Sequence, residues 1–130
     1  MADRTLECQK ALVARLRAEV AEVSGRVYDR APDNAAFPFV EIGDVVTTPL
    51  DAQAMRGGEA LWQIDVWSRR GGRVEARRIM GAVYDALHWH ALALEAGAAV
   101  LCRVSARRDM DDPDGVTAHG IVEVTILTDG

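Results

Sequence analysis

The stretch from Glu59 to Ser68 constrains the fold most, because apolar and polar residues alternate along it. Its apolar positions are Trp62, Ile64 and Val66. Successive side chains of a strand point to opposite faces, so the pattern predicts a strand with one buried face and one partly polar face. A glycine pair at 71–72 then ends the strand and opens the next element.

Two stretches with helical spacing predict amphipathic helices, one from Thr5 to Ser24 and one from about Arg73 to His90. The predicted apolar stripes are Leu6, Leu12, Val13, Leu16, Val20 and Val23 in the first helix, and Ala76, Ile79, Met80, Val83 and Leu87 in the second. Gly25 is well placed to end the first helix.

Three more strands are predicted, at 39–46, around 100–105 and at 120–128, from alternating apolar residues. The polar run 47–58 reads as a loop too long for a tight hairpin, and 109–115 contains a Pro-Asp-Gly turn signal. The predicted order is helix, strand, strand, helix, strand, strand. Hairpins predominate, so we expect an α+β domain, a mainly antiparallel sheet with both helices packed on one face.

Length and composition fit a single domain spanning residues 1–130. The chain has 49% hydrophobic and 27% charged residues, the balance of an ordinary globular domain. A net charge of -5 argues against a protein that mainly clamps a phosphate backbone. Cys8 and Cys102 lack metal or disulfide spacing, which favours apolar packing in a reducing compartment. The sequence shows no signal peptide and no membrane span.

The arginine-rich segment 69–78 leaves three interpretations open: a solvated face, a protein contact, or a phosphate site. On a helical wheel, Arg73 and Arg77 fall on one flank of the polar arc and Arg78 on the other, so they form no single stripe. The glycine pair before the helix matches neither glycine-rich phosphate-binding pattern. A solvated face is the simplest interpretation.

No residue pattern predicts a metal, cofactor or catalytic site. His88 and His90 are two apart, which points them to different sides of a helix, so a helix end with one half-buried histidine is the simpler interpretation. The aspartates of 109–114 fail the EF-hand template at Pro113 and Gly120, which favours a solvated hairpin tip over a weak ion site. No activated nucleophile or carboxylate pair stands out, so we expect no enzyme activity and no cofactor.

Trp62 is expected to anchor the core, whereas Trp67 is expected on the opposite face of the same strand, with Asp65. A large aromatic side chain there is exposed unless it packs within the monomer or a partner covers it.

Three segments together resemble the tail-terminator, or tail-completion, family of long-tailed bacteriophages and gene transfer agents. They are YDRAPDNAAFPFVEIG, ALWQIDVWSRRGGRVEARRIMGAVYDALH and RRDMDDPDGVTAHGIVEVTIL. The resemblance covers about residues 6–128. Its most specific parts are the F-P-F-V-x-I-G segment and the strand-turn-helix that follows.

This resemblance implies a structural role. It implies a homo-oligomer, a hexameric ring on the last ring of the tail tube, which stops tube growth and docks the head connector. DNA would pass through the channel without specific binding, and an acidic protein suits such passage. The protein would be found in the bacterial cytoplasm during assembly and then at the head-proximal end of the tail. The alternatives are a head-tail joining (neck) protein and a small-ligand-binding α+β domain.

A closed ring needs two different patches that meet on neighbouring protomers. We expect Trp67, Arg69 and Arg70 in one patch. The acidic segment 109–114, with Asp111 and Asp112, is expected in the other patch or in a docking surface. The loop 47–58, with Leu50, Met55 and Arg56, is expected to contact the tube or line the channel.

Overall fold

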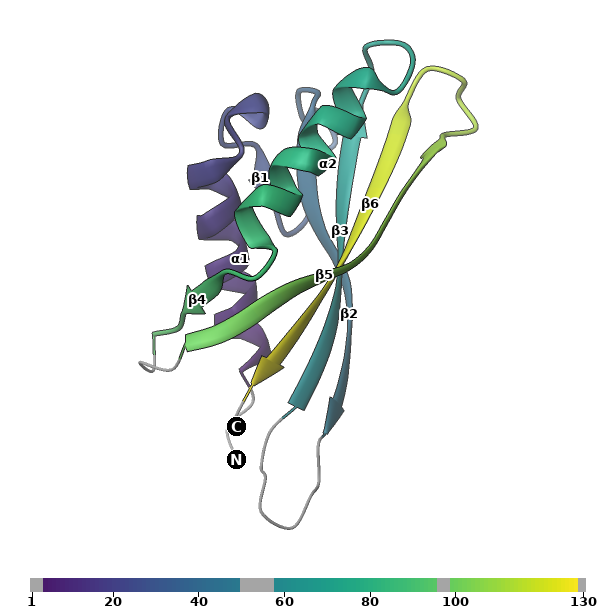
Figure 1. Ribbon diagram of the computed structural model, residues 1–130. Helices are drawn as coiled ribbons and strands as arrows, with labels where there is room; N and C mark the ends of the chain where they lie inside the picture. Colours follow the sequence, from purple (N-terminus) through teal and green to yellow (C-terminus); the bar gives the residue numbers. More distant parts are fainter. Residues whose placement is uncertain (1–3, 50–57, 96–98, 129–130) are drawn as a thin grey trace.

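The structure, a computed structural model, describes residues 4–49, 58–95 and 99–128 (Figure 1). Its elements, in chain order, are α1 (Thr5–Glu19), the 3₁₀-helix η1 (Ala21–Val23), β1 (Val27–Tyr28), β2 (Phe39–Pro49), β3 (Gly58–Ser68), α2 (Val74–Leu87), β4 (Ala91–Ala93), β5 (Ala99–Asp111) and β6 (Ala118–Thr128). The predicted α+β class is confirmed. The element order differs from the prediction, because the short strands β1 and β4 and the turn of helix η1 interrupt it.

The strands form one six-stranded sheet in the order β1-β2-β3-β6-β5-β4. Every neighbouring pair is antiparallel except β1 and β2, which are parallel. β2 with β3 and β5 with β6 are the two hairpins that the sequence predicts. The central pair, β3 with β6, joins strands far apart in the chain.

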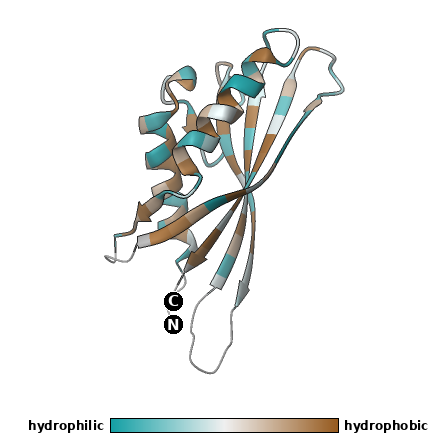
Figure 2. Ribbon diagram, viewed as in Figure 1, coloured by the Kyte–Doolittle hydropathy of each residue, from teal (hydrophilic) through white to brown (hydrophobic). Residues whose placement is uncertain are grey.

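Both helices lie on the same side of the sheet (Figure 1). The alternation along β3 produces this arrangement, since Trp62, Ile64 and Val66 are buried in one core cluster that also holds residues of α1 and α2. Hydrophobic and hydrophilic residues alternate along the strands in Figure 2. Trp62 is 1% exposed, so its predicted role as a core anchor is confirmed.

The helices differ in how well their sequence pattern predicts their buried face. All five predicted stripe residues of α2 are buried. In α1 the buried residues are Cys8, Leu12 and Leu16, four apart along one side of the helix. Leu6 is 61% exposed, contrary to the prediction, because it lies two residues, about 200° of helical rotation, from Cys8.

Several predicted boundaries are wrong. α1 ends at Glu19 rather than Ser24, and the 3₁₀-helix η1 separates it from Gly25. α2 ends at Leu87 rather than His90, because Trp89 and His90 leave the helix to exchange backbone hydrogen bonds with Cys102. The predicted loop 47–58 is shorter, because residues 47–49 belong to β2 and Gly58 to β3. The predicted hairpin tip at 109–115 begins later, since β5 continues to Asp111.

The sheet has two distinct ends, set by its register. At one end Pro49 lies opposite Gly58, and Gly58 lies opposite Thr128. At the other end Phe39 lies opposite Trp67, and Trp67 lies opposite His119. The face away from the helices therefore runs from the Pro49–Gly58 end of the sheet to an aromatic end. In the described part of the chain, no helix is long and apolar enough to cross a membrane.

Candidate functional site

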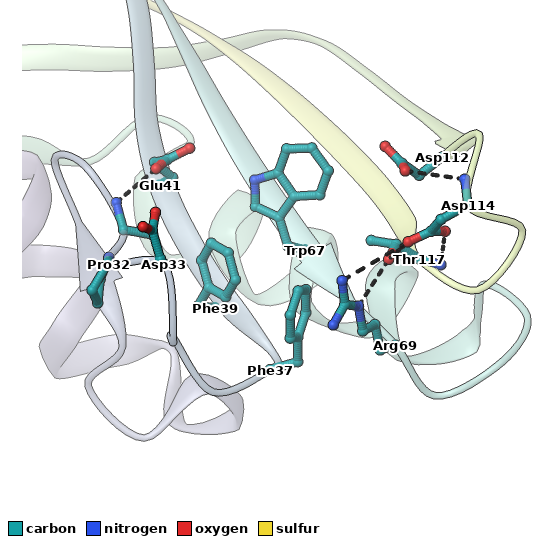
Figure 3. Close-up of a pocket in the computed structure, with 11 residues that line it drawn as sticks. Pro32, Asp33, Phe37, Phe39, Glu41, Trp67, Arg69, Asp112, Asp114 and Thr117 are labelled. Carbon is teal, nitrogen blue, oxygen red and sulfur yellow. Dashed lines mark hydrogen bonds and ion pairs between the residues drawn. The ribbon is translucent and has the colours of Figure 1, made fainter.

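A pocket of about 290 Å³ opens at the aromatic end of the sheet (Figure 3). It is lined by the start of β2, the end of β3, the segment 31–37 and the turn between β5 and β6. The lining residues are Ala31, Pro32, Asp33, Phe37, Phe39, Glu41, Trp67, Arg69, Asp112, Asp114 and Thr117. We call this surface the aromatic pocket.

A row of rings forms its floor. Phe37 and Phe39 have ring centroids 5.0 Å apart, and Phe39 stacks at 6.5 Å from Trp67. On its other side, Trp67 lies 3.9 Å from the His119 ring at an interplanar angle of 8°. Trp67 is therefore half-buried within the monomer rather than fully exposed. Its indole Nε1 has no hydrogen-bond partner within the described residues.

A buried pair holds the aromatic row in place. His119 Nε2 lies 2.7 Å from Oδ1 of Asp65, which also accepts a 2.9 Å hydrogen bond from Gln63. Asp65 is 7% exposed although it lies on the face away from the helices. Gly43 makes this burial possible, because a Cβ there would lie 2.5 Å from Oδ2 of Asp65.

The rim on the other side is a tightly bonded turn. Asp114 accepts hydrogen bonds from the backbone N–H groups of Val116 and Thr117 and from the Thr117 hydroxyl, the last at 2.6 Å. Chiefly the Thr117 hydroxyl, and then these N–H groups, lower the pKa of Asp114 to about 2. Arg69 donates to Thr117, lies 3.9 Å from Asp114 and stands over the Phe37 ring at 4.2 Å.

The remaining arginines of 69–78 divide into paired and unpaired groups. Arg73 and Arg77 share Asp109, and Arg73 also binds Asp111 at 2.9 Å. These bonds lower the pKa of Asp109, mainly through Arg77. Arg70 lies 3.5 Å from Glu75, whereas no ion pair involves Arg78 among the described residues. The paired arginines thus find acidic partners within their own chain, where the sequence suggested solvent or a neighbouring subunit.

The structure brings three predicted site residues together and separates the others. Trp67, Arg69 and Asp112 line the aromatic pocket from β3 and the β5–β6 turn. Arg70 and Asp111 lie outside its lining, and each pairs with a residue of α2 or its entry. The predicted residues Leu50, Met55 and Arg56 lie outside the described residues.

His88, His90 and both cysteines lie outside the lining of the aromatic pocket. Nδ1 of His88 accepts a hydrogen bond from the N–H of Val104, and its ring stacks on Tyr84. His90 is exposed and lies 3.3 Å from Arg15. Cys8 and Cys102 are both buried, and burial raises the pKa of Cys102 to about 12. Within the described residues no group of His, Cys, Asp and Glu has metal-binding geometry.

Sequence reasoning missed several pocket residues: Asp33, Phe37, Phe39, Glu41, Asp114 and Thr117. The F-P-F segment is recognisable in the sequence, but nothing local places it beside Trp67. His119 was missed for a similar reason, because it meets Trp67 only through the long-range pairing of β3 with β6.

The pocket therefore combines aromatic rings, one arginine and several carboxylates on the face of a small α+β domain. Aromatic residues and arginine are enriched in protein-binding surfaces, and the domain that carries the pocket is a small α+β protein. The family model for "Tail completion protein gp17" matches residues 10–129. A relative from Bacillus phage SPP1, also called tail completion protein gp17, is 32% identical over an alignment of 128 residues, and the match covers 95% of this chain and 92% of the relative. The chain belongs to the tail completion protein gp17 family.

Two solved structures share the fold. The bacteriophage SPP1 gp17 protein superposes with a TM-score of 0.62 at 28% identity, over 91% of this chain and 86% of that chain. A chain of the virion of a native gene transfer agent particle superposes with a TM-score of 0.88 and covers 100% of both chains. Its sequence identity is 18%, so this second likeness concerns the fold.

Proposed function

We propose that this protein is the tail terminator of a phage or phage-like particle. It forms a ring, a hexamer, that caps the tail tube, stops its growth and gives the head connector a surface on which to dock. The observation that carries this proposal is the family match, which spans residues 10–129 and hence nearly the whole fold. DNA passes through the ring without being read, and the net charge of -5 disfavours adhesion to phosphates.

The two ends of the sheet serve two different partners in this proposal. The aromatic pocket, with Trp67, Arg69 and Asp112, docks the head connector. The rings of Phe37 and Trp67 are only partly buried, and aromatic rings that a partner can cover are typical of a protein-binding hot spot. The segment with Leu50, Met55 and Arg56 connects β2 to β3 in the sequence. In this proposal it contacts the tube or lines the channel. Arg70 and Asp111 flank the pocket end and contribute to the same docking surface or to a subunit contact.

The proposed role is structural, without catalysis or cofactor. The protein acts by occupying the end of the growing tube. It replaces the surface that would add another tube subunit with a surface that binds the head connector. Before assembly it resides in the bacterial cytoplasm, and afterwards it remains in the particle at the head-proximal end of the tail.

Electron microscopy of particles from the native host tests this function. A deletion of the gene is compared with wild type and with the deletion complemented in trans. We expect overlong or unattached tails in the deletion, with a ring missing at the head-proximal end. Unattached tails of normal length, with a ring still capping the tube, would instead indicate the neck position, one layer nearer the capsid. Normal particles from the deletion strain would refute both virion roles and leave the pocket as a small-ligand site.

A further inference from the structure

The outermost long strands of the sheet are only partly paired. β1 pairs with β2 only at Val40 and Glu41, and β4 pairs with β5 only at 99–101. Beyond these short strands, 42–49 of β2 and 103–111 of β5 have no strand neighbour on their outer side in the described chain. The N–H of Val104 is occupied, since it donates to His88. Such edges present backbone donors and acceptors to another chain.

The directions of the two edges suit a rotational ring. β2 is antiparallel to β3, β3 to β6 and β6 to β5, so β2 and β5 run in opposite directions. A rotation about the ring axis keeps every protomer the same way up. β5 of one protomer would therefore meet β2 of the next as an antiparallel pair, without inversion of either subunit.

The charges of the two edges are complementary. Along β5, Arg103 and Arg108 are exposed and form no ion pair with any described residue. Arg107, between them, instead stands over the Tyr84 ring of its own chain at 4.4 Å. The aspartates of this strand, Asp109 and Asp111, are bound to arginines of their own chain.

On the opposite side of the sheet the surplus is acidic. Glu41 and Asp44 lie in β2, and Asp33 lies in the segment before it. Neither Asp33 nor Asp44 forms an ion pair with a described residue. Pairing two β5 edges would oppose arginine to arginine, and pairing two β2 edges would oppose acid to acid. Electrostatics thus favours unlike edges over a symmetric dimer.

We infer that the ring closes by strand pairing, with the free β5 edge of one protomer against the free β2 edge of the next copy of the chain. The sheet then continues from subunit to subunit, and the helices all lie on one side of it. This inference rests on the ring of the proposed function and names its interface. Asp33 and Glu41 also line the aromatic pocket, so the ring interface borders the pocket on its acidic side, whereas Trp67 and Arg69 remain available to a different partner.

Cysteine cross-linking tests the inference in assembling particles. Thr48 and Ser105 are exposed residues on the face away from the helices, one on each free edge; Thr48 lies opposite Glu59, and Ser105 bonds Thr125. Chains carrying Thr48→Cys, Ser105→Cys or both are expressed in the deletion host and treated with a bis-maleimide. The linker spans about 7 Å, so it can join the two cysteines even if they are displaced by two residues along the paired strands. Buried Cys8 and Cys102 remain unreactive.

The double variant should give a ladder of covalent oligomers that reaches the ring size, and each single variant should remain monomeric. Thr48→Cys combined with Glu22→Cys, on the exposed surface of η1, is the matched control and should give no ladder. Monomers alone from a double variant whose tails are normal would overturn the edge pairing while leaving the terminator function standing. Dimers from a single variant would overturn the head-to-tail arrangement.

A charge exchange covers the case in which the cysteine variants fail to assemble. Arg103→Glu with Arg108→Glu should lower the number of capped tails by roughly tenfold or more, because acidic side chains would then face acidic side chains. Adding Asp44→Arg to these two changes should restore a substantial part of the number of capped tails. A normal number of capped tails with the Arg103→Glu, Arg108→Glu double variant would overturn the inference. So would a triple variant that is folded by circular dichroism but caps no more tails than the double variant.

Discussion

Gly43 and Gly120 mark two places where a strand backbone comes directly against a side chain. A Cβ at 43 would lie 2.5 Å from a carboxylate oxygen of Asp65, and a Cβ at 120 would lie 2.6 Å from the sulfur of Met80. The two conflicts differ in kind. Met80 is a flexible side chain that can move, whereas Asp65 is fixed by His119 and Gln63. The close approach at Gly43 therefore supports the buried pair beneath the aromatic pocket.

Gly43→Ala should lower the free energy of unfolding by about 1–3 kcal/mol, because the new methyl group displaces the Asp65 carboxylate from its partners. Gly81→Ala is the matched control. Gly81 lies inside α2, where a Cβ would meet nothing within 4 Å, and alanine there should raise stability by about 0.5–1 kcal/mol. Urea unfolding of both variants measures the difference, and equal effects would contradict the role given to Gly43.

Asp114 predicts a local acid response. Its folded pKa of about 2 lies below the ordinary value of 3.8, so its contribution to stability is complete above about pH 4 and is lost as the pH falls toward 2. The difference in melting temperature between wild type and Asp114→Asn should therefore shrink over that window. Thermal unfolding from about pH 5 to pH 2 checks this, and a constant difference would contradict the assignment.

The sequence predicts best those elements in which apolar residues repeat regularly over many positions. β3 alternates over ten residues and α2 keeps its stripe over four turns, so both are found where expected. β1 and β4 have 2 and 3 residues, too few to show any period. The end of α2 was misplaced because His90 continues the apolar stripe, while hydrogen bonds to Cys102 in β5 draw the chain out of the helix.

The candidate site was only partly predictable for a related reason. The alternation along β3 places Trp67 on the face away from the core, and the arginine-rich turn that follows contains Arg69. Both residues can therefore be identified from the sequence. The rest of the pocket comes from segments brought together by tertiary pairing, with Phe39 opposite Trp67 on one side and His119 on the other. Strand periodicity tells which face a residue occupies but not which strand lies beside it.

α1 should depend on tertiary packing rather than on its own helix propensity. Its buried stripe is narrow, and Leu12 within it is fully buried. Leu12→Ala should cost about 2–5 kcal/mol of unfolding free energy, through lost burial and the cavity left behind. Leu6→Ala, at a position 61% exposed, should change it by less than about 0.5 kcal/mol. Chemical denaturation monitored by circular dichroism measures both, and a large effect at Leu6 would contradict the placement of the stripe.

At the scale of the whole molecule, the helices cover one face of the sheet and leave the other face uncovered in the described chain. Besides the aromatic pocket, that face carries four exposed aliphatic side chains on four adjacent strands: Val46, Leu61, Leu101 and Leu127. The pocket and the Pro49–Gly58 pair lie at opposite ends of this face. Variants at the two ends should therefore have separable effects on the particle.

Trp67→Ala should give tails of normal length that fail to join heads, with a reduction in joined particles of roughly tenfold or more if the indole is a hot spot. Trp89→Ala is the control, since Trp89 is 58% exposed and lies outside the pocket. Tail lengths and the fraction of tails attached to heads are counted by negative-stain electron microscopy. Overlong tails from Trp67→Ala would assign the pocket to the tube, and normal joining would remove it from docking altogether.

The equal length of β3 and β6, 11 residues each, makes the sheet a spacer. At about 3.3 Å per residue, the strands hold the two ends of the protomer about 36 Å apart, less whatever their tilt removes. A strand does not stretch, so whatever binds at one end is kept at a fixed height above whatever binds at the other. Lengthening both strands by two residues would raise that height by up to about 7 Å without altering either binding surface. If the protein is the proposed terminator, the number of residues in these strands sets the gap between tube and connector.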